Sequence, residues 1–205
     1  MENDSTSGGG NAAFQARPLT GSRWAPWVTT FLILLATVCL LRSEGRTWWC
    51  ACGQPNLWSG DPQSSHSSQH LFDPYSFTHI LHGALICGML ALTLPRLSPA
   101  GALTATVFLE ALWEILENSP FIIGRYRTST IALGYEGDSI VNSLGDILSC
   151  SLGFLLARRI GWRWSIVMVV VTESILLLWI RDNLLLNVVM LIWPIDAIKT
   201  WQAGP

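Results

Sequence analysis

The chain has 205 residues, of which 50% are hydrophobic and 13% are charged. A soluble domain carries about 25% charged residues, so this composition indicates an integral membrane protein. The formal net charge of −2 argues against a nucleic-acid partner, because nucleic-acid-binding domains are usually strongly basic.

The first 23 residues form a polar tail, which we expect to be disordered because it buries too little apolar surface. Residues 24–205 are expected to form one transmembrane helical domain with a long loop at 42–75. The predicted helices follow six apolar stretches: Ala25–Leu41, Ser76–Leu94, Ala102–Glu117, Ser139–Ala157, Trp164–Ile180 and Leu184–Ile198. A spanning helix needs about 20 residues. Pro194 interrupts the sixth stretch, which could therefore span the membrane or re-enter on the same side. The predicted fold is an all-α polytopic bundle of five to six transmembrane helices.

Basic residues give the predicted orientation of this bundle. With a cytoplasmic N-terminus, seven of the 12 Lys and Arg residues lie on the cytoplasmic side and five on the other side. Cytoplasmic loops are generally richer in Lys and Arg. The bias, led by the Arg158–Arg159 pair, predicts that the N-terminus is cytoplasmic and that the loop at 42–75 faces the envelope.

Three carboxylates in the third apolar stretch share one face of a helix. Glu110, Glu114 and Glu117 follow i, i+4, i+7 spacing, which places them within roughly 60° of one another. The rest of this helix is apolar, and an ionised carboxylate inside a membrane is costly unless it has a partner. Such acids therefore predict a functional site.

The other intramembrane polar residues are predicted at the same depth. Successive helices run in opposite directions and rise about 1.5 Å per residue. Counting along each helix places all these groups in the half of the membrane next to the long loop. They are His79, His82, Glu110, Glu114, Glu117, Asp138, Asn142, Asp146, Glu173 and Asn187. This shared depth predicts a polar cavity that opens toward the loop.

Three interpretations of these residues remain open. His79, His82, Glu110, Glu114 and Glu117 are a mixed nitrogen and oxygen ligand set that suits a divalent metal such as zinc, manganese or iron. Alternatively, they line a metal-free cavity, or they form an ion-pair network that fixes the packing of the helices. In a catalytic version, His79, His82, Glu110 and Glu114 act as ligands or acid–base groups, with Asp138 and Asp146 opposite them.

Two loops carry further candidates. Arg125 and Arg127 are predicted to hold a phosphate, because guanidinium groups bind phosphate oxygens in a bidentate fork; membrane anchoring explains them equally well. Asn142, Glu173 and Arg181 complete the predicted substrate-binding set. Cys50-x-Cys52 and His66-x3-His70 resemble a zinc site only loosely, since one residue between the cysteines is fewer than usual, and we expect four separate side chains.

Several segments resemble an uncharacterised family of small bacterial multi-pass membrane proteins. These segments are Ser68–His70, Tyr75–Gly83, Glu110–Pro120, Arg125–Arg127, Gly137–Ser143 and Ile180–Leu184. The resemblance runs from about Cys50 to Gln202, and the N-terminal tail and His66 lie outside it. It implies residence in the bacterial cell membrane and gives no reaction. A shorter stretch, Asp138–Asn142 with Gly145, Asp146 and Gly153, is similar to VanZ-like membrane proteins.

The function hypothesis is an envelope-facing polar site in the bacterial inner membrane that binds a lipid headgroup or small polar molecule, with metal-assisted catalysis as an open option. Membrane lipids are the expected partners, and the sequence identifies no protein partner. The alternative is a non-catalytic transporter or a scaffold of an envelope complex. Transporters commonly show inverted repeats or paired broken helices. The sequence has no visible repeat, so transport ranks second.

Overall fold

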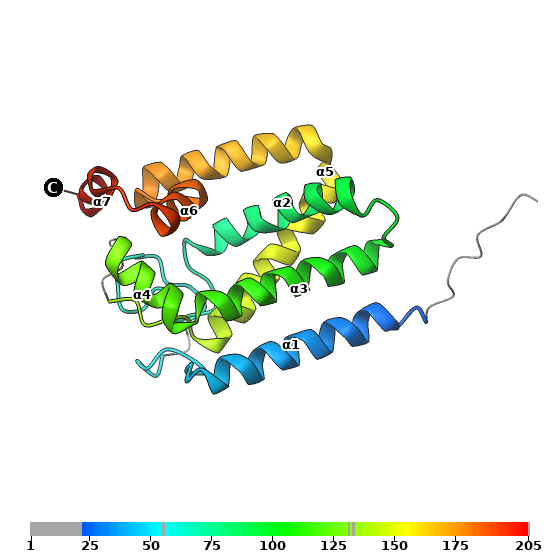
Figure 1. The fold of residues 1–205 in the computed structure, drawn as a ribbon, viewed down its shortest axis with the longest axis horizontal. Coiled ribbons are helices and arrows are strands. Elements are labelled where there is room, and N and C mark those ends of the chain that lie inside the picture. Colours follow the sequence, from blue (N-terminus) through cyan, green and yellow to red (C-terminus); the bar gives the residue numbers. More distant parts are fainter. Residues whose placement is uncertain (1–21, 55, 131, 133, 205) are drawn as a thin grey trace, which may run out of the picture.

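The computed structural model describes residues 22–204 except 55, 131 and 133, so most of the predicted N-terminal tail lies outside the described residues. The described part is all-helical, as predicted, and contains no named strand. Its seven helices are α1 (Ala25–Ser43), α2 (Ser76–Thr93), α3 (Pro99–Glu117), α4 (Pro120–Ser129), α5 (Ile140–Ile180), α6 (Leu184–Ile192) and α7 (Asp196–Ala203). Figure 1 shows the long helices side by side, with α4, α6 and α7 gathered near one end of the bundle.

Four of the helices begin at a residue whose side chain caps the first turn. Ser98, Ser119 and Ser139 accept hydrogen bonds from backbone amides at the starts of α3, α4 and α5, and Asn183 does the same for α6. Serine and asparagine are preferred at this position because they satisfy amide groups that have no partner within the helix. The polar residues between the apolar stretches therefore determine where these helices begin.

Helix α5 contains two of the predicted membrane segments. Its 41 residues would extend about 60 Å if straight, which is twice the thickness of a bilayer core. The backbone leaves the helical conformation at Gly161, with φ 79° and ψ 167°. Figure 1 shows the chain turning there and the second arm running back along the bundle. Ser139–Ala157 and Trp164–Ile180 are thus separate arms, as predicted.

The sixth apolar stretch forms no spanning helix. Helix α6 has nine residues and ends at Ile192, before Pro194, so it extends only about 14 Å. Helix α7 adds eight residues after the break. Four helices, α1, α2, α3 and α5, are long and apolar enough to cross a membrane. Because α5 turns back on itself, they supply five apolar arms, the lower of the two predicted numbers.

Helices α2 and the first arm of α5 form the closest pair in the bundle. A Cβ atom added at Gly83 of α2 would lie 1.9 Å from the carbonyl oxygen of Cys150, and one added at Gly153 of α5 would lie 1.9 Å from that of Ile80. Glycines allow such close approach of helices in membranes. This contact brings the start of α2 directly against the start of α5, where the polar residues lie.

The long loop covers the same end of the bundle. Ser139 donates its backbone amide to the carbonyl of Ser68 at 2.9 Å and its hydroxyl to that of Gln69 at 3.1 Å. The side-chain amide of Gln69 donates to the carbonyl of Gly137 at 2.8 Å. Residues 68 and 69 are therefore fixed to the segment that begins α5.

A buried acid–histidine cluster as the candidate functional site

Four segments bring six carboxylates and two histidines to the loop-facing end of the bundle. The loop contributes Asp73, the first turns of α2 contribute two histidines, and the last turns of α3 contribute three glutamates. Two aspartates come from the residues that begin α5. We call this set the acid–histidine cluster: Asp73, His79, His82, Glu110, Glu114, Glu117, Asp138 and Asp146.

The two histidines contact carboxylates of α3 and α5. His79 Nδ1 lies 2.5 Å from Glu110 Oε1 and 3.5 Å from Glu114 Oε1, and its Nε2 lies 3.8 Å from Asp146 Oδ2. His82 Nδ1 lies 3.0 Å from Glu110 Oε1. Glu110 thus binds both imidazoles and fixes their orientation.

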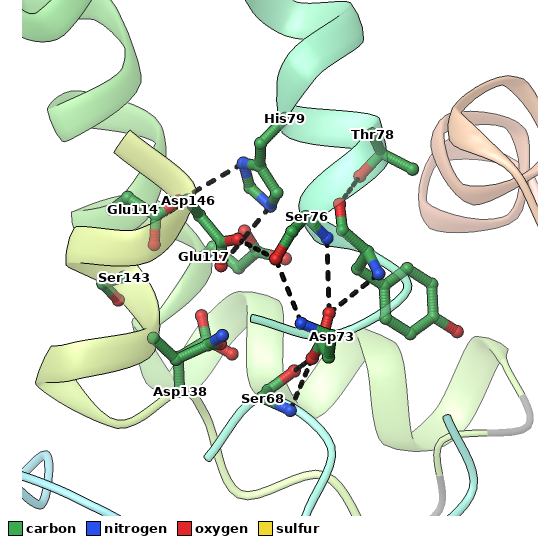
Figure 2. A network of polar contacts seen from close by, with 12 residues as sticks. Ser68, Asp73, Ser76, Thr78, His79, Glu114, Glu117, Asp138, Ser143 and Asp146 are labelled. Carbon is green, nitrogen blue, oxygen red and sulfur yellow. Dashed lines mark hydrogen bonds and ion pairs between the residues drawn. The ribbon is translucent and has the colours of Figure 1, made fainter. Parts of the chain in front are cut away.

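Ser76 links the cluster to the loop, as Figure 2 shows. Its hydroxyl donates to Asp146 Oδ1 at 3.0 Å and accepts from the backbone amide of Asp73 at 3.1 Å. Asp73 in turn accepts from the amides of Ser68 and Tyr75, each at 2.7 Å. Burial raises the pKa of Asp73 above its usual value, and these hydrogen bonds lower it only in part. Asp73 therefore ties the loop to the start of α2.

A second group of polar residues surrounds Asp138. Tyr135 donates its hydroxyl to Asp138 Oδ1 at 2.8 Å, and Asn118 donates its amide to Asp138 Oδ2 at 3.0 Å. Burial raises the pKa of Asp138 above its usual value, and these two bonds oppose that shift. Tyr126 of α4 donates to Glu117 Oε1 at 2.8 Å. Neutral donors thus satisfy both oxygens of Asp138 and one oxygen of Glu117.

Glu114 has no such donors. Its side chain is fully buried, and neither carboxylate oxygen has a hydrogen-bond partner among the described residues. Glu117 Oε2 and the side-chain amide of Asn142 are also buried without partners. Buried polar atoms are nearly always hydrogen-bonded, so unpaired ones require an explanation. The unpaired atoms here lie where α2, α3 and α5 meet.

The charges in the cluster do not balance. Six carboxylates face two histidines, and in the described residues no Lys or Arg forms an ion pair with any of them. Bound protons or a bound cation must therefore supply positive charge. Two groups have the spacing of metal ligands, with one ligand atom from each residue within 4.8 Å of the others: His79, His82 and Glu110, and His79, Glu114 and Glu117.

The structure encloses these groups more completely than the sequence led us to expect. We predicted a cavity open toward the loop, but Glu110, Glu114 and Asp146 are only 1%, 0% and 4% exposed. The close contact of α2 with α5 and the position of residues 68–73 over the helix ends explain the difference. The prediction of an open cavity is therefore wrong for this conformation, although the structure does bring His79, Glu110, Glu114 and Asp146 together.

Four predicted binding residues lie outside the cluster and contact backbone groups. Arg125 donates to the carbonyl of Leu191 at the end of α6. Arg127 donates to the carbonyl of Tyr135, and Arg181 donates to that of Trp201. Glu173 accepts from the amides of Leu184 and Leu185 and so caps the start of α6. Each of these side chains has a structural contact in this conformation.

Sequence reasoning missed several members of the polar network, namely Asp73, Ser76, Asn118, Tyr126 and Tyr135. Asp73, Asn118 and Tyr135 lie just outside the apolar stretches, where polar residues are usually solvated. One signal was available for Asn118: it directly follows Glu117 and continues the polar face of α3.

An apolar groove of about 280 Å³ lies beside the cluster. Its lining includes Trp113 of α3, with Arg125 as the charged residue at its edge. The indole of Trp113 packs edge-on against the imidazole of His82, with ring centroids 6.0 Å apart. The indole of Trp113 thus lies between the groove and His82 of the cluster.

Comparisons with known proteins identify relatives but no activity. A family described as "Protein of unknown function (DUF2585)" matches residues 41–204. A UPF0314 protein of Paracoccus denitrificans is 46% identical over 183 residues, which are 89% of this chain and 94% of that protein. A UPF0314 protein of Sphingopyxis alaskensis is 44% identical over 179 residues, 87% of this chain and 95% of that protein. No solved structure matches the chain.

These matches confirm the expected resemblance to an uncharacterised bacterial family. They extend over most of the chain and include all the residues of the acid–histidine cluster. The comparisons do not show the weaker similarity to VanZ-like membrane proteins.

Proposed function

The chain belongs to the DUF2585 family, whose function is unknown, and we propose that its acid–histidine cluster holds a divalent metal ion within the membrane and acts on the headgroup of a lipid. The observation that carries this proposal is Glu114. Its two buried oxygens accept no hydrogen bond, and the His79 imidazole 3.5 Å away is shared with Glu110 and Asp146, so further positive charge is needed to stabilise this carboxylate. A cation supplies that charge.

The chemistry of the side chains favours a metal of the zinc, manganese or iron type. Imidazole together with carboxylate is the ligand set that such ions bind. Of the two groups with ligand spacing, His79, Glu114 and Glu117 would supply three ligands to the ion. Glu110, placed between the two imidazoles, would hold them in a fixed orientation, as carboxylates beside metal-bound histidines commonly do.

The surroundings support a lipid as the molecule acted on. The apolar groove at Trp113 has the lining that an acyl chain requires, and it lies next to His82. A headgroup attached to such a chain would reach the cluster from the membrane. A metal bound by three protein ligands keeps a position free for a headgroup oxygen or for water, and it polarises either one. Asp138 and Asp146 lie opposite as acid–base groups.

Binding of Mn²⁺ tests the metal directly. Manganese prefers oxygen and nitrogen ligands, so cysteines elsewhere in the chain compete little for it. We expect purified wild-type protein to retain about one Mn²⁺ ion per chain after excess metal is removed. Glu114→Gln should bind Mn²⁺ at least about ten-fold more weakly, because it loses a ligand of the ion. Electron paramagnetic resonance of free and bound Mn²⁺ measures both affinities.

Glu136→Gln is the matched control, because Glu136 is exposed and lies outside the cluster. It should bind Mn²⁺ like the wild type. Wild-type protein that retains no Mn²⁺, or a Glu114→Gln variant that binds Mn²⁺ as tightly as the wild type, would refute the metal centre. The charge balance of the cluster would then rest on protons, and a metal-free binding site would replace the proposed centre.

We also propose that the chain resides in the inner membrane with a cytoplasmic N-terminus, so that the cluster faces the envelope. The proposal rests on the distribution of basic residues and on the five apolar arms. Reporter fusions at residues 60 and 130 should be active in the periplasm, and fusions at 97 and 160 should be active in the cytoplasm. The reverse pattern would place the cluster at the cytoplasmic side and exclude an envelope-facing site.

A further inference from the structure

The loop between α1 and α2 brings two cysteines and two histidines together. Cys50, Cys52, His66 and His70 each offer one ligand atom, and these four atoms all lie within 4.8 Å of one another. Cys50 Sγ lies 3.3 Å from His66 Nδ1, and the rings of His66 and His70 stack with centroids 5.6 Å apart. The prediction of four separate side chains is therefore wrong, because the folded loop joins segments that are 16 residues apart.

Two of the four side chains are buried although the loop is largely exposed. Cys50 is 7% exposed and His70 is 1% exposed. His70 Nδ1 is buried and has no hydrogen-bond partner among the described residues. Burial of a polar nitrogen without a hydrogen-bond partner is unfavourable. The position of His70 is explained if this nitrogen binds a ligand.

Backbone amides surround the two sulfur atoms. The amide of Cys52 donates to Cys50 Sγ at 3.3 Å, and the amide of Gln54 donates to Cys52 Sγ at 3.4 Å. Ligand atoms in a tetrahedral zinc site lie about 3.3–3.8 Å apart. The distance from Cys50 Sγ to His66 Nδ1 already has this value, and the remaining separations require a contraction of at most about 1.5 Å.

We propose that Cys50, Cys52, His66 and His70 bind a zinc ion in a closed, four-ligand structural site that is distinct from the acid–histidine cluster. Two thiolates and two imidazoles are a usual ligand set for structural zinc. The single residue between the cysteines is shorter than usual, whereas the three residues between the histidines are common. A disulfide between Cys50 and Cys52 would be strained by their closeness in sequence, which leaves both sulfurs available.

The zinc ion would fix the loop to the end of the bundle. His70 lies three residues before Asp73, whose carboxylate accepts from the amides of Tyr75 and Ser76 at the start of α2. It directly follows Gln69, whose carbonyl accepts from Ser139 at the start of α5. A metal bond between His70 and the segment at Cys50 therefore closes a ring of chain beside the acid–histidine cluster. Metal binding of this kind contributes folding free energy, because the site does not exist in the unfolded chain.

Cobalt substitution tests this site with a signal that the cluster lacks. Co²⁺ bound to thiolate gives a sulfur-to-metal charge-transfer band in the near ultraviolet. We expect wild-type protein, reduced and loaded with Co²⁺, to show this band and to lose it when one equivalent of Zn²⁺ is added. Cys50→Ser and His70→Ala should lose most of the band. Cys52→Ser removes an exposed ligand, so it tests the site even if the variants at buried positions fold poorly.

Two variants serve as controls. Cys39→Ser removes an exposed cysteine of α1 and should retain the band. Glu114→Gln should also retain it while losing Mn²⁺, which separates failure of this site from failure of the proposed function. The zinc site is refuted if the reduced wild-type protein shows no thiolate band, or if the band persists in a folded Cys50→Ser, Cys52→Ser double variant.

Discussion

Glu110→Gln is expected to lower the free energy of unfolding by about 3–5 kcal/mol, whereas Glu114→Gln leaves the metal-free protein as stable as the wild type or more so. Glu110 contacts both imidazoles, at 2.5 Å and 3.0 Å, so its removal leaves the buried His79 and the half-buried His82 without their principal partner. Loss of one partner from a buried pair typically has this effect. Glu114 accepts no hydrogen bond, and its neutralisation relieves repulsion among crowded carboxylates.

Thermal unfolding in detergent, with chelator present, measures this contrast. The two substitutions are chemically identical and lie four residues apart on α3, so a general effect on membrane insertion would affect both equally. Glu136→Gln, at an exposed position, gives the baseline. Equal destabilisation by Glu110→Gln and Glu114→Gln would indicate a purely structural ion-pair network, in which both carboxylates support the packing of the helices.

Gly153→Ala is expected to destabilise the bundle by about 3 kcal/mol, a large effect for the addition of one methyl group. The new Cβ would lie 1.9 Å from the carbonyl oxygen of Ile80, which belongs to backbone and cannot rotate away. Helices α2 and α5 must then separate, and overpacking of this kind costs about 1–3 kcal/mol or more. Because His79 lies on α2 and Asp146 on α5, the same separation should also lengthen the contact between these two side chains.

The control for this variant is Gly88→Ala on α2, where an added Cβ meets nothing within 4 Å. Alanine favours a helix by about 1 kcal/mol over glycine, so this variant should be slightly more stable than the wild type. Melting temperature and yield from membranes distinguish the two. A wild-type melting temperature for Gly153→Ala would show that α2 and α5 do not form the close contact described above.

The sequence predicted the location of the site well because the constraints there are strong. Polar groups cannot face hydrocarbon, so the i, i+4, i+7 spacing of Glu110, Glu114 and Glu117 required a shared partner surface. Depth counting then identified His79 and Asp146 as residues of the same layer. What the pattern could not give is the distinction between Glu110, which contacts two histidines at hydrogen-bond distance, and Glu114, which accepts no hydrogen bond. That distinction depends on side-chain distances across three helices.

The contacts of loop residues could not be predicted from the sequence for a related reason. A helix has fixed geometry, whereas the course of a loop depends on contacts between distant residues. Cys50 and His66 meet only because Gln69 and Ser68 are held against Ser139, some 70 residues further along the chain. Asp73 likewise becomes buried only after the loop covers the helix ends. No spacing rule within the loop contains this information.

The break in α5 changes the number of apolar arms that can cross the bilayer. At φ 79° Gly161 occupies a backbone region that L-amino acids with side chains rarely adopt. If a helix-forming residue stood there and α5 ran straight, the membrane would be crossed an even number of times. With the break, α5 supplies two apolar arms instead of one, and the described helices contain an odd number of such arms. Under the proposed topology, the break at Gly161 therefore places the start of α1 and the start of α6 on opposite faces of the membrane.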